Sequence, residues 1–172
     1  ELRRGGQAFY LHNRVESVYT VAAKLREDLP DARIAVGHGK MEREELEEIW
    51  EDLVRGEIDI LVSTTIIETG VDVPNANTLI IDDANRYGLS QLHQLRGRVG
   101  RGKAKSYCVL VSDAKGSDAR ARLDVLKKNH DGNAIAEEDL RLRGPGDFLQ
   151  TGGEIRQHGD VRLPVAAGPG DV

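Results

Sequence analysis

Short apolar runs alternate with segments of helical periodicity along the first part of the chain. The run at residues 58–62 (IDILV) is almost uninterrupted, which predicts a central parallel strand covered on both faces. Further strands are predicted at residues 7–11, 33–36, 78–81 and 106–112, and amphipathic helices at 15–29 and 42–54. A series of this kind predicts an α/β fold with a doubly wound, mostly parallel sheet of about five or six strands.

The chain changes character beyond residue 113. Residues 118–128 and 134–142 have helical spacing, and the polar break between them predicts a helical hairpin. The last residues are rich in glycine, proline and alanine and offer little to bury. We therefore predict an α/β domain at 1–113, a helical hairpin with its loop at 114–159, and a frayed tail at 160–172.

Composition limits the classes of protein. A chain of 172 residues with 39% hydrophobic residues can bury one good core, and its net charge of −5 confines any nucleic-acid contact to a local patch. The single cysteine, Cys108, excludes an intramolecular disulfide and a cysteine-rich zinc site. The absence of a long apolar run or signal peptide predicts a soluble, cytoplasmic protein. The opening at Glu1, without an initiating methionine, favours a piece of a longer protein.

The stretch at residues 91–102 (QLHQLRGRVGRG) holds three arginines within six residues, separated by glycines. Guanidinium groups match pairs of phosphate oxygens, and glycines leave room for a close approach, so the pattern suits anions. Leucines at helical spacing would bring Gln94, Arg98 and Arg101 off one helix end toward a common side. The alternative is a solvated basic loop.

Hydroxyl groups follow the central strand, where Ser63, Thr64 and Thr65 precede a turn. Hydroxyls bind phosphate oxygens without requiring net positive charge, which is compatible with the acidic composition. Asp72 lies in a bend before Pro74, where it could accept a hydrogen bond from a ribose hydroxyl or an arginine, or simply form an Asx turn or helix cap.

Two acidic features are interpreted as structural. The adjacent Asp82 and Asp83 follow the strand at 78–81, and a strand would point them to opposite faces, so we expect loop polarity and no shared metal ion. The glutamates of the helix at 42–54 form the solvated side of a core-facing helix.

The motifs resemble those of superfamily 2 helicases and translocases. QLRGRVGR is similar to motif VI of that superfamily, and GLSQLHQLRGRVGR resembles the RecG and Mfd (transcription-repair coupling factor) branch. STTIIETGVDVP resembles motif V, and the strand followed by HNR resembles motif IV. The resemblance implies a RecA-like domain, the second motor domain of a helicase.

The resemblance also assigns roles to residues. It places His12, Asn13, Arg14, His38, Gly39, Thr64 and Thr65 near the DNA backbone, and Glu68, Gly70 and Asp72 facing the nucleotide. It makes Arg98 and Arg101 arginine fingers that also contact the nucleotide, with Gln94 as the neighbour that couples them.

The chain contains neither a G-x-x-x-x-G-K-[ST] loop nor an Asp-Glu pair after a strand to hold Mg²⁺ and orient water. In the families it resembles, those parts belong to a first, N-terminal RecA-like motor domain, and ATP with Mg²⁺ binds between the two domains. The resemblance thus implies that ATP and Mg²⁺ are the cofactors, and that this chain alone does not hydrolyse ATP.

The string AEEDLRLRGPGDFL resembles the RecG version of the motif that couples ATP turnover to translocation, whereas RGGQAFYLHNRVE is closer to Mfd. The coupling residues are then Arg141, Arg143, Arg156 and Gln157. A few extra residues separate the last two from GPGDFL, which departs from the RecG spacing.

The resemblance implies an ATP-dependent translocase or helicase of double-stranded or branched DNA, acting in repair or recombination. It implies a monomer that does not bind membranes, whose partners are the N-terminal motor domain and, if it is Mfd-like, RNA polymerase. A non-catalytic DNA-binding or protein-interaction module is one alternative, but it would not need the glutamine and arginines of motif VI. An RNA helicase is another, but it does not explain the AEEDLRLRGPG hairpin.

Overall fold

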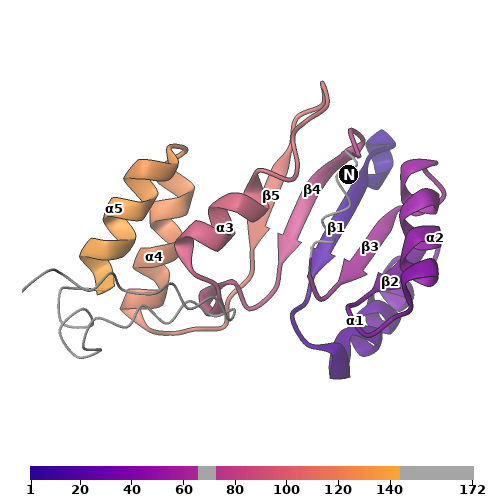
Figure 1. Ribbon diagram of the computed structural model, residues 1–172, viewed down its shortest axis with the longest axis horizontal. Coiled ribbons are helices and arrows are strands. Elements are labelled where there is room, and N and C mark those ends of the chain that lie inside the picture. The colour runs from indigo at the N-terminus through magenta and orange to yellow at the C-terminus, as the bar shows by residue number, and fades with distance from the viewer. Residues whose placement is uncertain (66–72, 144–172) are drawn as a thin grey trace, which may run out of the picture.

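The computed structural model describes residues 1–65 and 73–143. In this part of the chain five parallel strands form one sheet: β1 (Gln7–Leu11), β2 (Ile34–Gly37), β3 (Ile60–Ser63), β4 (Ala76–Ile81) and β5 (Tyr107–Leu110). Their order is β2-β3-β1-β4-β5 (Figure 1). The predicted α/β fold with a parallel sheet is confirmed.

The helices are α1 (Val15–Asp28), α2 (Arg43–Val54), α3 (Leu89–Arg96), α4 (Ser117–Lys128) and α5 (Gly132–Arg143), with 3-10 turns η1 (Leu2–Arg4) and η2 (Ala84–Arg86). Most helices and strands begin and end within two residues of the predicted positions. The apolar side chains that pack into the core recur with the period of each element, so the pattern also indicates where the element ends. The strand predicted at 58–62 is displaced to Ile60–Ser63, and Ile58 is buried just before it.

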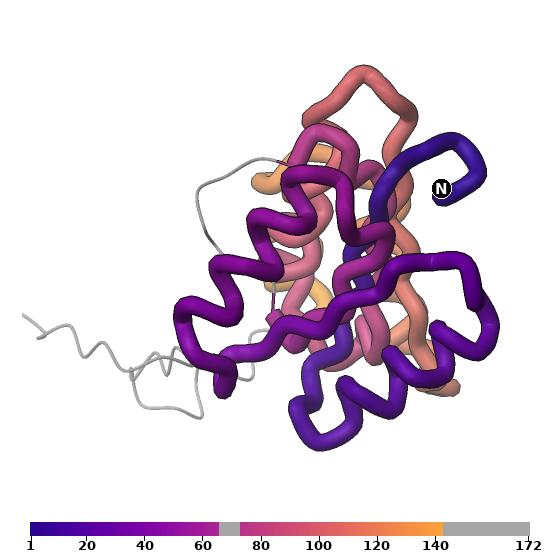
Figure 2. Tube along the Cα trace, turned by 90° about the vertical axis from the view of Figure 1, so that its right-hand side faces the viewer, coloured from indigo at the N-terminus to yellow at the C-terminus, as the bar shows by residue number. Residues whose placement is uncertain are grey.

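The two faces of the sheet are covered differently. On one face, side chains such as Phe9, Leu61 and Leu79 pack against Trp50 of α2 and Leu92 of α3. On the other face, a smaller cluster packs against α1; its members are Ala8, Val18, Ala22, Val36, Ile60 and Val62. Figure 2 shows the sheet between α2 on the left and α1 at the lower right. The alternation of strand side chains therefore divides the core into two layers.

The predicted helical hairpin is also present, and it packs against α3 (Figure 1). Leu126 of α4 and Ile135 of α5 are buried in the same cluster as Leu92. Each side chain of this kind contributes about 1.5–3 kcal/mol when it is withdrawn from water. The hairpin is thus held to the sheet domain through the face of α3 that points away from solvent.

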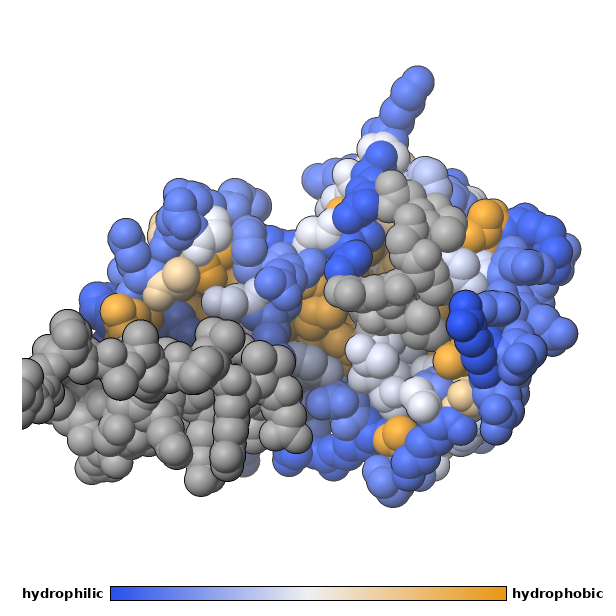
Figure 3. All heavy atoms as spheres, in the orientation of Figure 1, coloured by the Kyte–Doolittle hydropathy of each residue, from blue (hydrophilic) through white to orange (hydrophobic). Residues whose placement is uncertain are grey.

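The outer surface is mainly polar. Figure 3 shows hydrophilic residues over the α2 side of the molecule, where the glutamates of that helix point to solvent. Within the described residues, no helix is long and apolar enough to cross a membrane, and no group of three or more His, Cys, Asp or Glu residues could hold a metal ion. Cys108 is partly buried, and this burial raises the pKa of its thiol.

Candidate functional site

A groove lies at the carboxyl ends of β1 and β3, where α3 passes over them. It has a volume of about 370 Å³ and is lined by Leu11, Asn13, Thr64, Thr65, Tyr87, Gln91, Gln94, Leu95 and Arg98. Ligands of open parallel sheets gather at this edge, because the loops after neighbouring strands meet there. The groove brings together two sets of residues, the hydroxyls after the central strand and the side chains of the arginine-rich stretch, that are about thirty positions apart in sequence.

The polar lining of the groove suits an anion. Its described lining residues include a guanidinium, side-chain amides and hydroxyls but no carboxylate, although the chain as a whole has a net charge of −5. Thr64 is almost buried and Thr65 is exposed, so the two hydroxyls lie at different depths in the groove. Groups of these types bind phosphate oxygens by donating hydrogen bonds.

The three arginines of the glycine-rich stretch are separated by the structure. Helix α3 ends at Arg96, so Arg98 and Arg101 lie beyond the helix end and not on it. Arg98 is half-buried and lines the groove with Gln94, whereas Arg101 is exposed and is not among the lining residues. Gly100, between them, has a left-handed conformation (φ 82°), which turns the backbone before Arg101.

Arg96 has a different role from the anion binding that its motif suggests. Its Nη1 donates to the carbonyl oxygens of Leu126 and Asn129 at 2.6 and 2.9 Å, and its Nη2 lies 3.0 Å from Nδ1 of His93. These carbonyls belong to the C-terminal end of α4, where helix carbonyls lack intrahelical donors. Arg96 therefore joins α3 to the hairpin.

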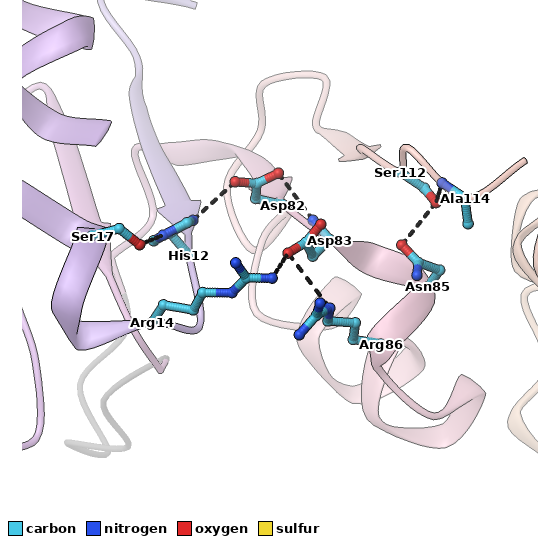
Figure 4. Close-up of polar contacts among 9 residues, drawn as sticks. All are labelled: His12, Arg14, Ser17, Asp82, Asp83, Asn85, Arg86, Ser112 and Ala114. Atoms are coloured by element: carbon cyan, nitrogen blue, oxygen red, sulfur yellow. Dashed lines mark hydrogen bonds and ion pairs between the residues drawn. The ribbon is translucent and has the colours of Figure 1, made fainter. Parts of the chain in front are cut away.

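His12 is held inside a network at the end of β1 (Figure 4). Its Nδ1 lies 2.9 Å from Oδ2 of Asp82 and its Nε2 lies 2.7 Å from Oγ of Ser17. The residue is 8% exposed, so both ring nitrogens are satisfied within the protein. His12 thus connects the ends of β1 and β4 to the first turn of α1.

Arg14 and Asp83 form a second link between the same two strand ends. Nη2 of Arg14 donates to Oδ2 of Asp83 at 2.8 Å, and Nε of Arg86 lies 3.7 Å from the same oxygen (Figure 4). Asp83 is the only described non-glycine residue with a positive φ, 49°. The adjacent aspartates, interpreted from sequence as loop polarity, therefore fix the loop after β4 against the predicted DNA-binding residues after β1.

The end of β5 is fastened to the same region. Oγ of Ser112 donates to Oδ1 of Asn85 at 2.8 Å and accepts from the backbone N–H of Ala114 at 3.2 Å (Figure 4). Tyr87, just after η2, lines the groove, and its buried hydroxyl has no hydrogen-bond partner among the described residues. Burial, with the negative charges of Asp82 and Asp83, raises the pKa of Tyr87 to about 12, so it remains a neutral potential donor.

His38 and Gly39 lie at the end of β2, apart from the groove lining. Nε2 of His38 is 2.9 Å from the hydroxyl of Tyr19, and the backbone N–H of Lys40 donates to its Nδ1 at 3.3 Å. Gly39 is exposed, with no atom within 4 Å of the position that a Cβ would take. His38 therefore shapes the turn, and Gly39 leaves the backbone open to solvent beside it.

The profile described as "Helicase conserved C-terminal domain" matches residues 1–103. The chain belongs to this helicase C-terminal domain family. Over 167 residues, 94% of the chain, this helicase C-terminal domain is 50% identical to the transcription-repair-coupling factors of Staphylococcus haemolyticus and Staphylococcus aureus (strain USA300). It spans 14% of the length of these relatives.

Solved structures agree with this assignment. A structure of RecG bound to a three-way DNA junction matches 86% of the chain and 20% of its own, with a TM-score of 0.72 and 44% identity. The C-terminal domain of Dbp5 from S. cerevisiae, in a complex with Gle1 and IP6, matches 81% of the chain and 76% of its own, with a TM-score of 0.60. At 17% identity the Dbp5 match shows the fold alone.

The remaining predicted site residues of the helicase C-terminal domain belong to its C-terminal half or to motif V. Arg141 is 70% exposed and donates from Nε to Glu138 within the same helix at 2.8 Å. Arg143 is the last residue of α5. Five predicted residues lie outside the described ones: Glu68, Gly70, Asp72, Arg156 and Gln157.

Proposed function

We propose that this domain is the second motor domain of an ATP-dependent translocase or helicase of double-stranded or branched DNA. Its relatives are named for transcription-repair coupling, and the matching RecG structure contains a three-way DNA junction. Because the chain spans 14% of those relatives, the activity is that of the longer protein. We assign it to DNA repair or recombination in the cytoplasm, with RNA polymerase as a partner if the role is that of a coupling factor.

The groove at the ends of β1 and β3 is the observation that carries the proposal. Gln94, Arg98, Thr64 and Thr65 line the same space of about 370 Å³. A guanidinium beside amide and hydroxyl donors matches phosphate oxygens, which carry negative charge and accept hydrogen bonds.

Nucleotide binding is the first use that we propose for the groove. The donor set fits a triphosphate, with Arg98 and Gln94 as the groove residues, Arg101 as a second finger, and Glu68, Gly70 and Asp72 from motif V. ATP with Mg²⁺ supplies the transferable phosphoryl group, held jointly with an N-terminal RecA-like motor domain. Arg98 would stabilise the negative charge that grows on the phosphoryl oxygens in the transition state. In enzymes where the effect of such an arginine has been measured separately, it raises the rate by about 10³ to 10⁵.

Contact with the DNA backbone is the second use. Thr64, Thr65 and Asn13 offer donors without net charge at the strand ends, and Arg14 adds a partly exposed guanidinium. Such contacts position a duplex without reading its sequence. His12 would act from inside the protein, by holding the loops that carry these donors, and His38 and Gly39 would border the path.

The test is a pair of substitutions in the longer protein. Arg98→Ala should lower the kcat of DNA-stimulated ATP hydrolysis by about 10² or more while nucleotide affinity stays within a few-fold, because a finger acts on transition-state charge. Gln94→Glu has nearly the same shape but places a carboxylate in the groove, so it should weaken nucleotide binding.

Arg43→Ala is the matched control, because Arg43 is 87% exposed on α2, pairs with Glu47 and is not among the residues that line the groove. Its kinetics should match those of the wild type. If Arg98→Ala also retains wild-type kcat, Arg98 is not a finger, and the alternative of a non-catalytic binding module gains support.

A further inference from the structure

Within residues 1–65 and 73–143, one face of the sheet is only half covered. Helix α1 packs on β2 and β3, and its cluster reaches β1 through Ala8. Along the rest of that face, Tyr10 of β1 lies beside Ile80 of β4, and Ile80 lies beside Val109 of β5. Tyr107 and Val111 lie two residues before and after Val109, so they point to the same side.

These five residues, which we call the β4–β5 face, are more exposed than core strand residues. Tyr107 is 47% exposed, Val109 45% and Val111 39%, and Tyr10 and Ile80 are partly buried. The other large exposed hydrophobic residues of the described chain are scattered: Tyr19, Leu29, Val54 and Leu140. The β4–β5 face is therefore a contiguous apolar strip and not a chance exposure.

Parallel strands are normally covered on both faces, because the connections between them place helices there. The opposite face of β4 and β5 follows this rule, since Leu79, Cys108 and Leu110 pack into the large core cluster with α3. On the β4–β5 face the described residues supply no such layer beyond α1. This part of the sheet therefore has room for a further segment to pack on it.

We propose that the β4–β5 face is the docking surface for an amphipathic helical segment of the same polypeptide, outside residues 1–172. The chain spans 14% of its coupling-factor relatives and 20% of the matching RecG chain, so most of such a polypeptide is available to provide it. The N-terminal turn η1 borders the face, because Arg4 lies 5.3 Å from the ring centre of Tyr107 and Glu1 bonds to Thr78. The N-terminal residues of the chain therefore already lie beside the β4–β5 face.

The margin of the face indicates the chemistry of this segment. Lys105 and Arg4 both pack on the ring of Tyr107, at 5.4 and 5.3 Å from its centre. Arg4 is already paired with Glu1 at 2.7 Å, so Lys105 is the cation that an acidic residue at the end of the segment would pair with. The centre of the segment must be aliphatic or aromatic to cover Ile80 and Val109.

Cysteine labelling tests the proposal in the longer protein. Val109→Cys and Val54→Cys are introduced separately with Cys108→Ala, and maleimide labelling is located by peptide mapping. Val54 is the control because it is 48% exposed, nearly as much as Val109, but lies on α2. We expect Val109→Cys to label at least tenfold more slowly than Val54→Cys in the longer protein, and at a similar rate in the 172-residue chain.

Three results would overturn the proposal. Equal labelling rates in the longer protein would mean that nothing covers the face. Slow labelling of Val109→Cys already in the 172-residue chain would mean that residues of this chain cover the face. Protection that increases with protein concentration would identify a second copy as the occupant.

A charge substitution gives an independent measurement. Val109→Glu should lower the Tm of the transition in which this domain unfolds within the longer protein by about 2 °C or more, because it buries a carboxylate under the segment. In the 172-residue chain the same change should have little effect, since the side chain remains in water. Equal shifts in both proteins would contradict the proposal.

Discussion

The guanidinium of Arg96 closes the end of α4 by donating from Nη1 to the carbonyl oxygen of Leu126 at 2.6 Å. The same nitrogen reaches the carbonyl oxygen of Asn129 at 2.9 Å. Arg96 is the last residue of α3 and lies between Leu95 and Arg98, which both line the groove. A movement of α3 is thus connected to the hairpin by charge-assisted hydrogen bonds as well as by apolar packing.

Arg96→Ala should lower the free energy of unfolding by about 1–3 kcal/mol, because it removes a charged donor from partly buried carbonyls. Denaturant unfolding of the domain measures this. Arg26→Ala is the control, because Arg26 also donates to a backbone carbonyl, that of Ile34, but at an exposed position. A loss for Arg96→Ala no larger than for Arg26→Ala would show that the link between α3 and α4 is not stabilising.

The coupling role of the hairpin predicts a separation of two activities. Arg143→Lys in the longer protein should leave DNA-stimulated ATP hydrolysis largely intact and reduce fork unwinding or triplex displacement tenfold or more. A lysine keeps the charge but loses the forked donors that a fixed lever requires. Arg156→Lys should have the same effect if Arg156 acts with Arg143 in coupling, despite the extra residues that separate it from GPGDFL.

Arg43→Lys is the matched control, because Arg43 is 87% exposed on α2 and pairs with Glu47, outside the predicted coupling residues. It should leave both activities unchanged. Equal losses of hydrolysis and of movement in Arg143→Lys would assign that arginine to fold stability and not to coupling.

Gly100 is predicted to tolerate no side chain. Its φ of 82° disfavours residues with a Cβ, and an added Cβ would lie 2.6 Å from Oγ of Ser106. Gly100→Ala should cost about 1–2 kcal/mol or more in unfolding free energy and shift the backbone before Arg101. Gly39→Ala, at an open position, should have a much smaller effect.

The double variant Gly100→Ala with Ser106→Ala separates the two causes. It relieves the contact with the hydroxyl but not the left-handed backbone, so it should recover only part of the lost stability. Full recovery would mean that the conformation itself is not strained.

The pair Arg33 and Asp59 should make stability depend on pH. Hydrogen bonds from the Arg33 side chain, against a smaller opposing effect of burial, hold the pKa of Asp59 below its ordinary value. A carboxyl with a lowered folded pKa stabilises the fold above its unfolded pKa, and this contribution is lost as pH falls through the folded value. Asp59→Asn should therefore destabilise the domain at pH 7 and progressively less below about pH 4. Unfolding curves at several pH values that show a constant difference would contradict this.

The fold could be predicted because each element has a simple pattern. The run that contains Ile60 and Val62 is apolar on both faces, as a central parallel strand requires, and the stripe with Trp50 and Leu53 has helical spacing. The uncovered side of β5 could not be predicted, because Val109 lies in an apolar run whether or not another layer covers it. Exposure depends on which helix packs where, and this is a property of the assembled sheet.

The site could be predicted in part. Arg98 and the hydroxyls after β3 were selected by residue type and by their place at strand ends, and they line one groove. Anion binding by these residues stays a prediction. The pairing of His12 with Asp82 could not be predicted without strand order. The pairing requires β1 and β4 to be neighbours in the sheet, although 64 residues (12–75) lie between the end of β1 and the start of β4. Arg96 was misleading because it lies in a stretch predicted from sequence to bind anions, whereas its side chain donates to the carbonyl oxygen of Leu126 in α4.

The shared core of sheet and hairpin determines where the domain can be cut. Leu89 and Leu92 are fully buried in a cluster to which the sheet contributes from one side and Leu126 and Ile135 from the other. A fragment that ended before α4 would expose the side of α3 that the hairpin covers, and this apolar surface would favour aggregation. A soluble form of the domain should therefore include α4 and α5.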